Sequence, residues 1–132
     1  MKPNRILLVD DDISLLFGYR VEMEMEHLLI DTATTLAEAD DLLNKEKYKA
    51  VVTDLNLAGK ESFEGLIIVD LAIKKQPDST VIVVTGISDD GIKESSLKAG
   101  AHFFLEKPVK ACDLIQLFEN HHSDKEAGGI RP

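Results

Sequence analysis

The chain has 132 residues, a length that suits one domain with a buried core. Its hydrophobic fraction of 44% and charged fraction of 30% exclude an intrinsically disordered chain. The formal net charge of −9 argues against nucleic-acid binding, because phosphate backbones are bound through lysine and arginine.

The first half of the chain alternates short apolar runs with patterns of helical period. The apolar runs predict strands over residues 6–9, 28–33 and 48–53. After the first run, apolar side chains recur at helical spacing at Ile13, Leu16, Phe17, Val21 and Met25. Thr35 followed by Glu38 forms a capping box, which predicts a second helix that continues to about residue 47.

The second half continues the alternation. Strands are predicted over residues 80–85 and 102–105, and helices over 66–75, 88–99 and 109–118. Gly100 is suited to end the polar helix before it. We expect residues 1–122 to form the domain, and the polar segment 123–132 to be a flexible tail or the start of a linker. Five βα units with almost wholly apolar strands predict an α/β fold, a doubly wound parallel sheet with helices on both faces.

The cysteine count and the hydropathy favour a cytoplasmic protein without membrane contact. Cys112 is the only cysteine, so no internal disulfide is possible and a reducing compartment is expected. A core or helix-surface position suits Cys112 better than a catalytic role, because no activating partner is visible. No apolar run approaches the length of a membrane span, and the run before Asp10 is too short for a signal-peptide core.

Polar side chains stand at the carboxyl ends of four predicted strands. In chain order they are Asp10, Asp11, Asp12, Asp54, Thr85 and Lys107. Parallel strands bring these ends to one edge of the sheet, which is where open α/β sheets bind ligands. Each residue also has an ordinary structural interpretation, and for Asp12 we favour a helix cap. The coincidence at four strand ends favours a functional site.

This set of groups suits phosphoryl chemistry. Carboxylates held close together raise one another's pKa, and a hard divalent cation such as Mg²⁺ relieves that conflict. A lysine ammonium binds a phosphate oxygen as a point charge, and a threonine hydroxyl can donate to another. Carboxylates are also nucleophiles that form aspartyl phosphates. The sequence therefore predicts a carboxylate that accepts a phosphoryl group.

Four segments carry these residues: ILLVDDD at 6–12, VVTDLNL at 51–57, VIVVTG at 81–86 and GAHFFLEKP at 100–108. With these segments in order and suitably spaced, residues 4–120 resemble the receiver domain of two-component response regulators, including the single-domain chemotaxis type. The resemblance implies a flavodoxin-like fold with strand order 2-1-3-4-5.

The resemblance assigns roles to the acids. It implies that Asp54 is the phosphoacceptor. It implies that Asp11 and Asp54 bind Mg²⁺ directly, together with the backbone carbonyl of Asn56, while Asp10 acts through water. The only catalysis it implies is of the protein's own phosphorylation and dephosphorylation, so the chain is not expected to be an enzyme acting on other substrates.

The resemblance also implies a conformational switch. Thr85 and Lys107 would bind phosphoryl oxygens, and Phe104 stands where the family has its switch aromatic. Phosphorylation would remodel the face built by the fourth helix, the fifth strand and the fifth helix, which is also a possible dimer surface. The Lys107–Pro108 bond is often cis in relatives.

The resemblance further implies partners. The phosphodonor would be a sensor histidine kinase or a histidine phosphotransfer protein that carries phosphohistidine. The downstream effector is not identified by the sequence. No nucleic acid and no membrane are expected as partners of this domain.

The segment after Asp54 departs from the family pattern in two ways. Ala58 stands where relatives usually have a proline, and the loop before Gly65 is longer by about three residues than is usual in the family. We expect this loop to affect partner docking or the rigidity of the metal site. Ile87, two residues after Thr85, lies at a position that with Asn56 influences self-dephosphorylation in the family.

Two other functions are weighed against the phosphorylated switch. A phosphatase of the haloacid dehalogenase type would use Asp10 as nucleophile with Asp12 as the second acid, but no glycine follows Asp12 and no cap domain fits. An interaction domain that only keeps the fold usually loses one acid or the lysine, whereas all are present here. Mapping the acyl phosphate to Asp54 or to Asp10 distinguishes the phosphorylated switch from the phosphatase.

Overall fold

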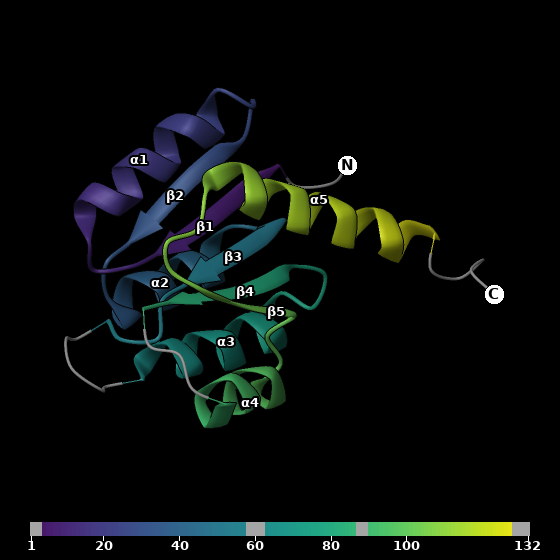
Figure 1. Cartoon of the computed structure of the whole chain (residues 1–132). Coiled ribbons are helices and arrows are strands. Elements are labelled where there is room, and N and C mark those ends of the chain that lie inside the picture. Colours follow the sequence, from purple (N-terminus) through teal and green to yellow (C-terminus); the bar gives the residue numbers. More distant parts are fainter. Residues whose placement is uncertain (1–3, 58–62, 87–89, 128–132) are drawn as a thin grey trace.

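Five parallel strands form one sheet in the order β2-β1-β3-β4-β5, as expected (Figure 1). The computed structural model describes residues 4–57, 63–86 and 90–127, with side chains described up to residue 123. The strands are β1 (Arg5–Val9), β2 (Leu29–Ala33), β3 (Ala50–Thr53), β4 (Thr80–Thr85) and β5 (Phe103–Glu106). The predicted flavodoxin-like α/β fold is confirmed.

Helices cover both faces of the sheet. They are α1 (Ile13–Glu24), α2 (Leu36–Lys45), α3 (Glu64–Lys75), α4 (Asp90–Ala99) and α5 (Ala111–Ala127). Helices α1 and α5 lie on one face, and α2 and α3 lie on the other with α4 next to α3 (Figure 1). Within the described parts of the chain, no helix combines the length and the apolarity that a membrane span requires.

The strands supply two cores because successive side chains point to opposite faces. In β1, Leu7 and Val9 pack into the core under α2 and α3, whereas Ile6 and Leu8 pack into the core under α1 and α5. All six residues of β4 are buried, as a central strand covered on both faces requires.

The predicted helix caps are present. The carboxylate of Asp12 accepts a hydrogen bond from the Leu15 amide at 3.1 Å, so Asp12 is the N-cap of α1. Thr35 caps α2 by accepting from the Glu38 amide, and Glu38 accepts from the amide of Thr34, one residue before the cap. Gly100 follows α4 with φ of +119°, where glycine carries no steric penalty.

The structure departs from the sequence-based elements at α1 and α5. Of the apolar series on α1, Leu16 alone is buried and shares the core face with Tyr19 and Met23. The other four members are exposed, Phe17 to 67%. Spacing alone indicated the helix but not which side the sheet covers. Helix α5 continues to Ala127, past the predicted end at residue 118 and across the expected boundary at 122.

Some expectations lie outside the described residues. They concern Ala58 and the longer loop through residue 62, Ile87, and the end of the tail from Gly128 onward.

Candidate functional site

The strand pairing places Asp10 and Asp54 side by side. Val9 pairs with Thr53 in the β1–β3 register, so the next residue on each strand leaves the sheet at the same edge. The Asp54 amide still donates to the Val9 carbonyl at 2.9 Å, which continues the ladder by one residue. The pairing of β1 with β3 therefore positions both carboxylates next to each other at this edge of the sheet.

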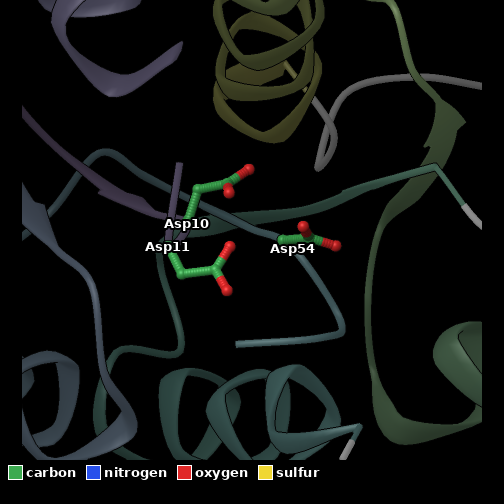
Figure 2. A group of neighbouring side chains, drawn as sticks. All are labelled: Asp10, Asp11 and Asp54. Carbon is green, nitrogen blue, oxygen red and sulfur yellow. The ribbon is translucent and has the colours of Figure 1, made fainter. Parts of the chain in front are cut away.

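Three carboxylates converge at this edge. Figure 2 shows Asp10, Asp11 and Asp54 as neighbours, and one oxygen from each lies within 4.8 Å of the others. Asp10 and Asp54 are buried, at 5% and 9% exposure, whereas Asp11 is exposed. Carboxylate oxygens in this number are the ligands that hard divalent cations prefer. The donor set fits Mg²⁺ or Ca²⁺.

Lys107 joins two of these acids. Its Nζ atom lies 2.7 Å from Oδ2 of Asp10 and 3.1 Å from Oδ2 of Asp54. The lysine follows β5, and its amide donates to the Thr85 carbonyl at 2.9 Å, which attaches this segment to β4. The sequence prediction that these three residues meet is confirmed as geometry.

Burial and pairing shift two of the pKa values. Burial raises the pKa of Asp10, although the hydrogen bonds from Lys107 and from the Asp12 amide oppose that shift. For Lys107, burial by itself lowers the pKa, but the hydrogen bonds and charges of Asp10 and Asp54 outweigh burial and raise the pKa. The ammonium is therefore charged at neutral pH and offsets part of the acidic charge.

The two oxygens of Asp54 have different surroundings. Oδ1 accepts a hydrogen bond from the Leu55 amide at 2.7 Å and a longer one from the Asn56 amide at 3.4 Å. Oδ2 faces Lys107. The side-chain oxygen of Asn56 is buried and has no hydrogen-bond partner among the described residues.

Thr85 and Phe104 occupy neighbouring strands. Thr85 is the last residue of β4 and is buried. Phe104 on β5 is partly buried and packs against the core under α2 and α3. The Lys107–Pro108 peptide is cis. Thr85 thus lies at the edge of the sheet that carries the acids, and Phe104 pairs with Val83, two residues before that edge; the roles of Thr85 and Phe104 stay predictions.

Sequence reasoning missed Tyr19, and it named Gly65 only as the glycine that follows the longer loop. The Tyr19 hydroxyl on α1 donates to the Val109 carbonyl at 2.6 Å, and burial raises its pKa. Gly65 on α3 packs against the backbone of Asp54 and Leu55. Neither contact has a signal in the sequence, because both join segments that only the fold brings together.

Comparisons with known proteins agree on one family. The family model for the response regulator receiver domain matches residues 6–119. The photosynthetic apparatus regulatory protein RegA of Cereibacter sphaeroides is 31% identical over 109 residues, covering 83% of this chain but only 58% of RegA. The chain therefore spans less than two thirds of that relative.

Solved structures show the same fold. A CheY-like response regulator receiver domain from Methanospirillum hungatei superposes with a TM-score of 0.85 at 28% identity, covering 96% of this chain and 99% of that one. The beryllofluoride-activated NtrC4 receiver domain dimer gives a TM-score of 0.79 at 29% identity, with coverages of 92% and 98%.

Proposed function

Because this chain belongs to the response regulator receiver domain family, we propose that it is a phosphorylated signalling switch whose phosphoacceptor is Asp54. The donor is a phosphohistidine on a sensor histidine kinase or a histidine phosphotransfer protein. The observation that carries the proposal is the position of Asp54: this residue is largely buried, and its Oδ2 faces the Lys107 ammonium beside two further carboxylates.

The proposed transfer makes one bond and breaks one. Oδ2 of Asp54 attacks the phosphorus, the phosphorus–nitrogen bond to the donor imidazole breaks, and that nitrogen keeps the electron pair and takes a proton from solvent. The Lys107 ammonium, next to Oδ2, would neutralise the charge of a phosphoryl oxygen. The Leu55 amide holds Oδ1 by a hydrogen bond, so that Oδ2 would be the attacking oxygen. The protein contributes positioning and charge screening.

We propose Mg²⁺ as the cation at the acidic cluster. Asp11 and Asp54 would bind it directly with the carbonyl of Asn56, and Asp10 would act through water. When bound, the cation supplies positive charge that reduces repulsion between these carboxylates and the incoming phosphoryl oxygens. The exposed position of Asp11 leaves that side of the cluster open to solvent.

Phosphorylation would be reported through β4 and β5. Thr85 would turn its hydroxyl toward a phosphoryl oxygen and Phe104 would move inward, so that the α4–β5–α5 face changes shape for an effector or a second copy. That the NtrC4 receiver is described as an activated dimer supports the second possibility.

The phosphodonor would dock on α1. Ile13, Phe17, Val21 and Met25 form a ridge at spacing of four residues, and all four are exposed, between 42% and 72%. The ridge begins next to Asp12, at the edge of the sheet that carries the acids. An exposed apolar ridge of this size favours a helical partner with a matching apolar face.

The remaining expectations follow the same proposal. We propose that the chain catalyses only its own phosphorylation and dephosphorylation, and that it acts in the cytoplasm. The competing phosphatase function is not favoured, because the carboxylate of Asp12, which would be its second acid, is engaged as the N-cap of α1.

Labelling with a small phosphodonor tests the proposal. With acetyl phosphate and Mg²⁺, we expect an acyl phosphate on Asp54 by peptide mapping, and no labelling of Asp54→Asn or without Mg²⁺. Asp41→Asn on α2 is the matched control, because Asp41 is exposed and pairs only with Lys45 among the described residues. Stable labelling of Asp10 with none on Asp54 would overturn the proposal.

A further inference from the structure

We infer that Gly65 is a positioning residue for the phosphoacceptor, because only a residue without a side chain lets α3 pack against the Asp54–Leu55 peptide. The inference rests on the proposed function of Asp54. It adds a residue outside the acidic cluster that sets which carboxylate oxygen faces the phosphodonor.

The packing at Gly65 leaves no room for a methyl group. A Cβ atom at this position would overlap the carbonyl oxygen of Asp54 and lie 2.5 Å from the Cα of Leu55 and 2.8 Å from the carbonyl carbon of Asp54. These are backbone atoms, so no side-chain rotation relieves the overlap. The Gly65 amide also donates to the Leu55 carbonyl at 2.9 Å, which attaches the first turn of α3 to the same segment.

A second contact holds the same peptide group from the strand side. The Thr53 hydroxyl donates to the Asp54 carbonyl at 2.9 Å, and Thr53 is fully buried. The Asp54 carbonyl is thus held between the end of β3 and the start of α3. Its orientation is decided by both neighbours.

This peptide group controls the carboxylate of Asp54. The amide of Leu55 belongs to the same peptide plane as the Asp54 carbonyl, and it donates to Oδ1 at 2.7 Å. Rotating the plane would move that donor, release Oδ1 and let the carboxylate turn. Oδ2 of Asp54 would then no longer be held 3.1 Å from the Nζ atom of Lys107. Gly65 therefore acts on the reacting oxygen through one peptide plane.

Gly65→Ala and Gly18→Ala form a matched pair for the test. Both glycines lie in helices, where alanine is the better helix former, but a Cβ at Gly18 meets nothing within 4 Å. With acetyl phosphate at saturating Mg²⁺, we expect Gly65→Ala to lower the rate of acyl phosphate formation about tenfold or more, because the nucleophile is misplaced. Gly18→Ala should keep the wild-type rate.

The Leu55 amide resonance supplies a readout that needs neither metal nor phosphodonor. At fixed pH in the metal-free protein, a short hydrogen bond to a carboxylate shifts this amide proton downfield. We expect Gly65→Ala to move it upfield and Gly18→Ala to leave it unchanged. A folded Gly65→Ala protein with the native rate and the native Leu55 resonance would overturn the inference.

Thr53→Val tests the same peptide if Gly65→Ala fails to fold. Valine keeps the shape of threonine but removes the hydroxyl that donates to the Asp54 carbonyl. We expect a smaller loss of rate and an upfield shift of the Leu55 amide in the same direction, and no change in either would contradict the inference. Should the wild-type protein not label at Asp54, the proposed function fails, while the Leu55 resonance still decides the positioning role.

Discussion

The ammonium of Lys107 lies 3.1 Å from Oδ2 of Asp54, although 53 positions separate the two residues in the chain. The same ammonium lies 2.7 Å from Asp10, so one cation serves two buried acids. An incoming phosphoryl group would bring further negative charge to this point, and Lys107 is already there to receive it. Lys107 thus offsets the charge of both acids, and under the proposed function it would also bind the phosphoryl group.

Removing that cation should raise the pKa of Asp10 further. Burial already raises it above 3.8, and Lys107 opposes the shift. With Lys107→Met, the raised pKa means that the folded state binds this proton more tightly than the unfolded state. The free energy of unfolding, relative to wild type, should therefore fall as pH rises from about 4 to about 7. Carbon-detected NMR titration of the carboxyl group measures the pKa, and urea unfolding measures the stability.

The control for this variant is Lys45→Met, since Lys45 pairs with Asp41 on the exposed surface of α2. It should leave the pKa of Asp10 unchanged. An unaltered or lower pKa of Asp10 in Lys107→Met would show that the lysine does not oppose burial as the geometry indicates.

Asp11→Asn should weaken Mg²⁺ binding about tenfold or more, because a charged ligand oxygen of the cluster is lost. Asp12→Asn is a stringent control one residue away: asparagine caps a helix as well as aspartate does, and Asp12 is not in the cluster. Isothermal titration calorimetry with Mg²⁺ measures both. Equal loss in the two variants would indicate a general effect of acidic charge and no defined site.

Phe17→Ser should slow phosphotransfer from a protein donor by about tenfold while labelling by acetyl phosphate keeps its rate. Phe17 is 67% exposed in the middle of the α1 ridge, so the change costs the fold little. Ile67→Ser removes a side chain that is 48% exposed on α3 and should affect neither reaction. If both variants transfer at the wild-type rate, the donor docks elsewhere.

Gln76→Ala should lower the free energy of unfolding by about 3 kcal/mol. The buried Gln76 amide donates to the carbonyls of Leu43 and Glu46, and its oxygen accepts from the Tyr48 amide at 2.9 Å. Alanine leaves all three groups without this partner, and the Leu43 carbonyl and the Tyr48 amide are buried. Urea unfolding measures the loss against Gln116→Ala on the exposed side of α5, which should change stability little. A loss below about 1 kcal/mol would show that water replaces these bonds.

The fold could be predicted from the sequence, because the local patterns for strands, helices and helix ends agree with one another. Apolar runs of strand length alternate with helical periods, and Asp12, Thr35 and Gly100 mark helix ends by their own side-chain or backbone chemistry. The acids and Lys107 could be placed together before any coordinates, since parallel strands end at a common edge.

Tertiary structure decided what depends on packing between distant segments. Whether Phe17 or Tyr19 faces the sheet depends on how α1 is rotated against β1 and α5, which spacing along α1 does not record. That Oδ2 of Asp54 faces Lys107 depends on the Leu55 amide, and the peptide plane of this amide is held by Gly65 on α3. Sequence alone determined which groups share the edge of the sheet, because the alternation of strands and helices along the chain implies parallel strands that end at one edge. Their orientation required the fold, because it depends on contacts from other elements, such as the Lys107 ammonium after β5 and the packing of Gly65 on α3.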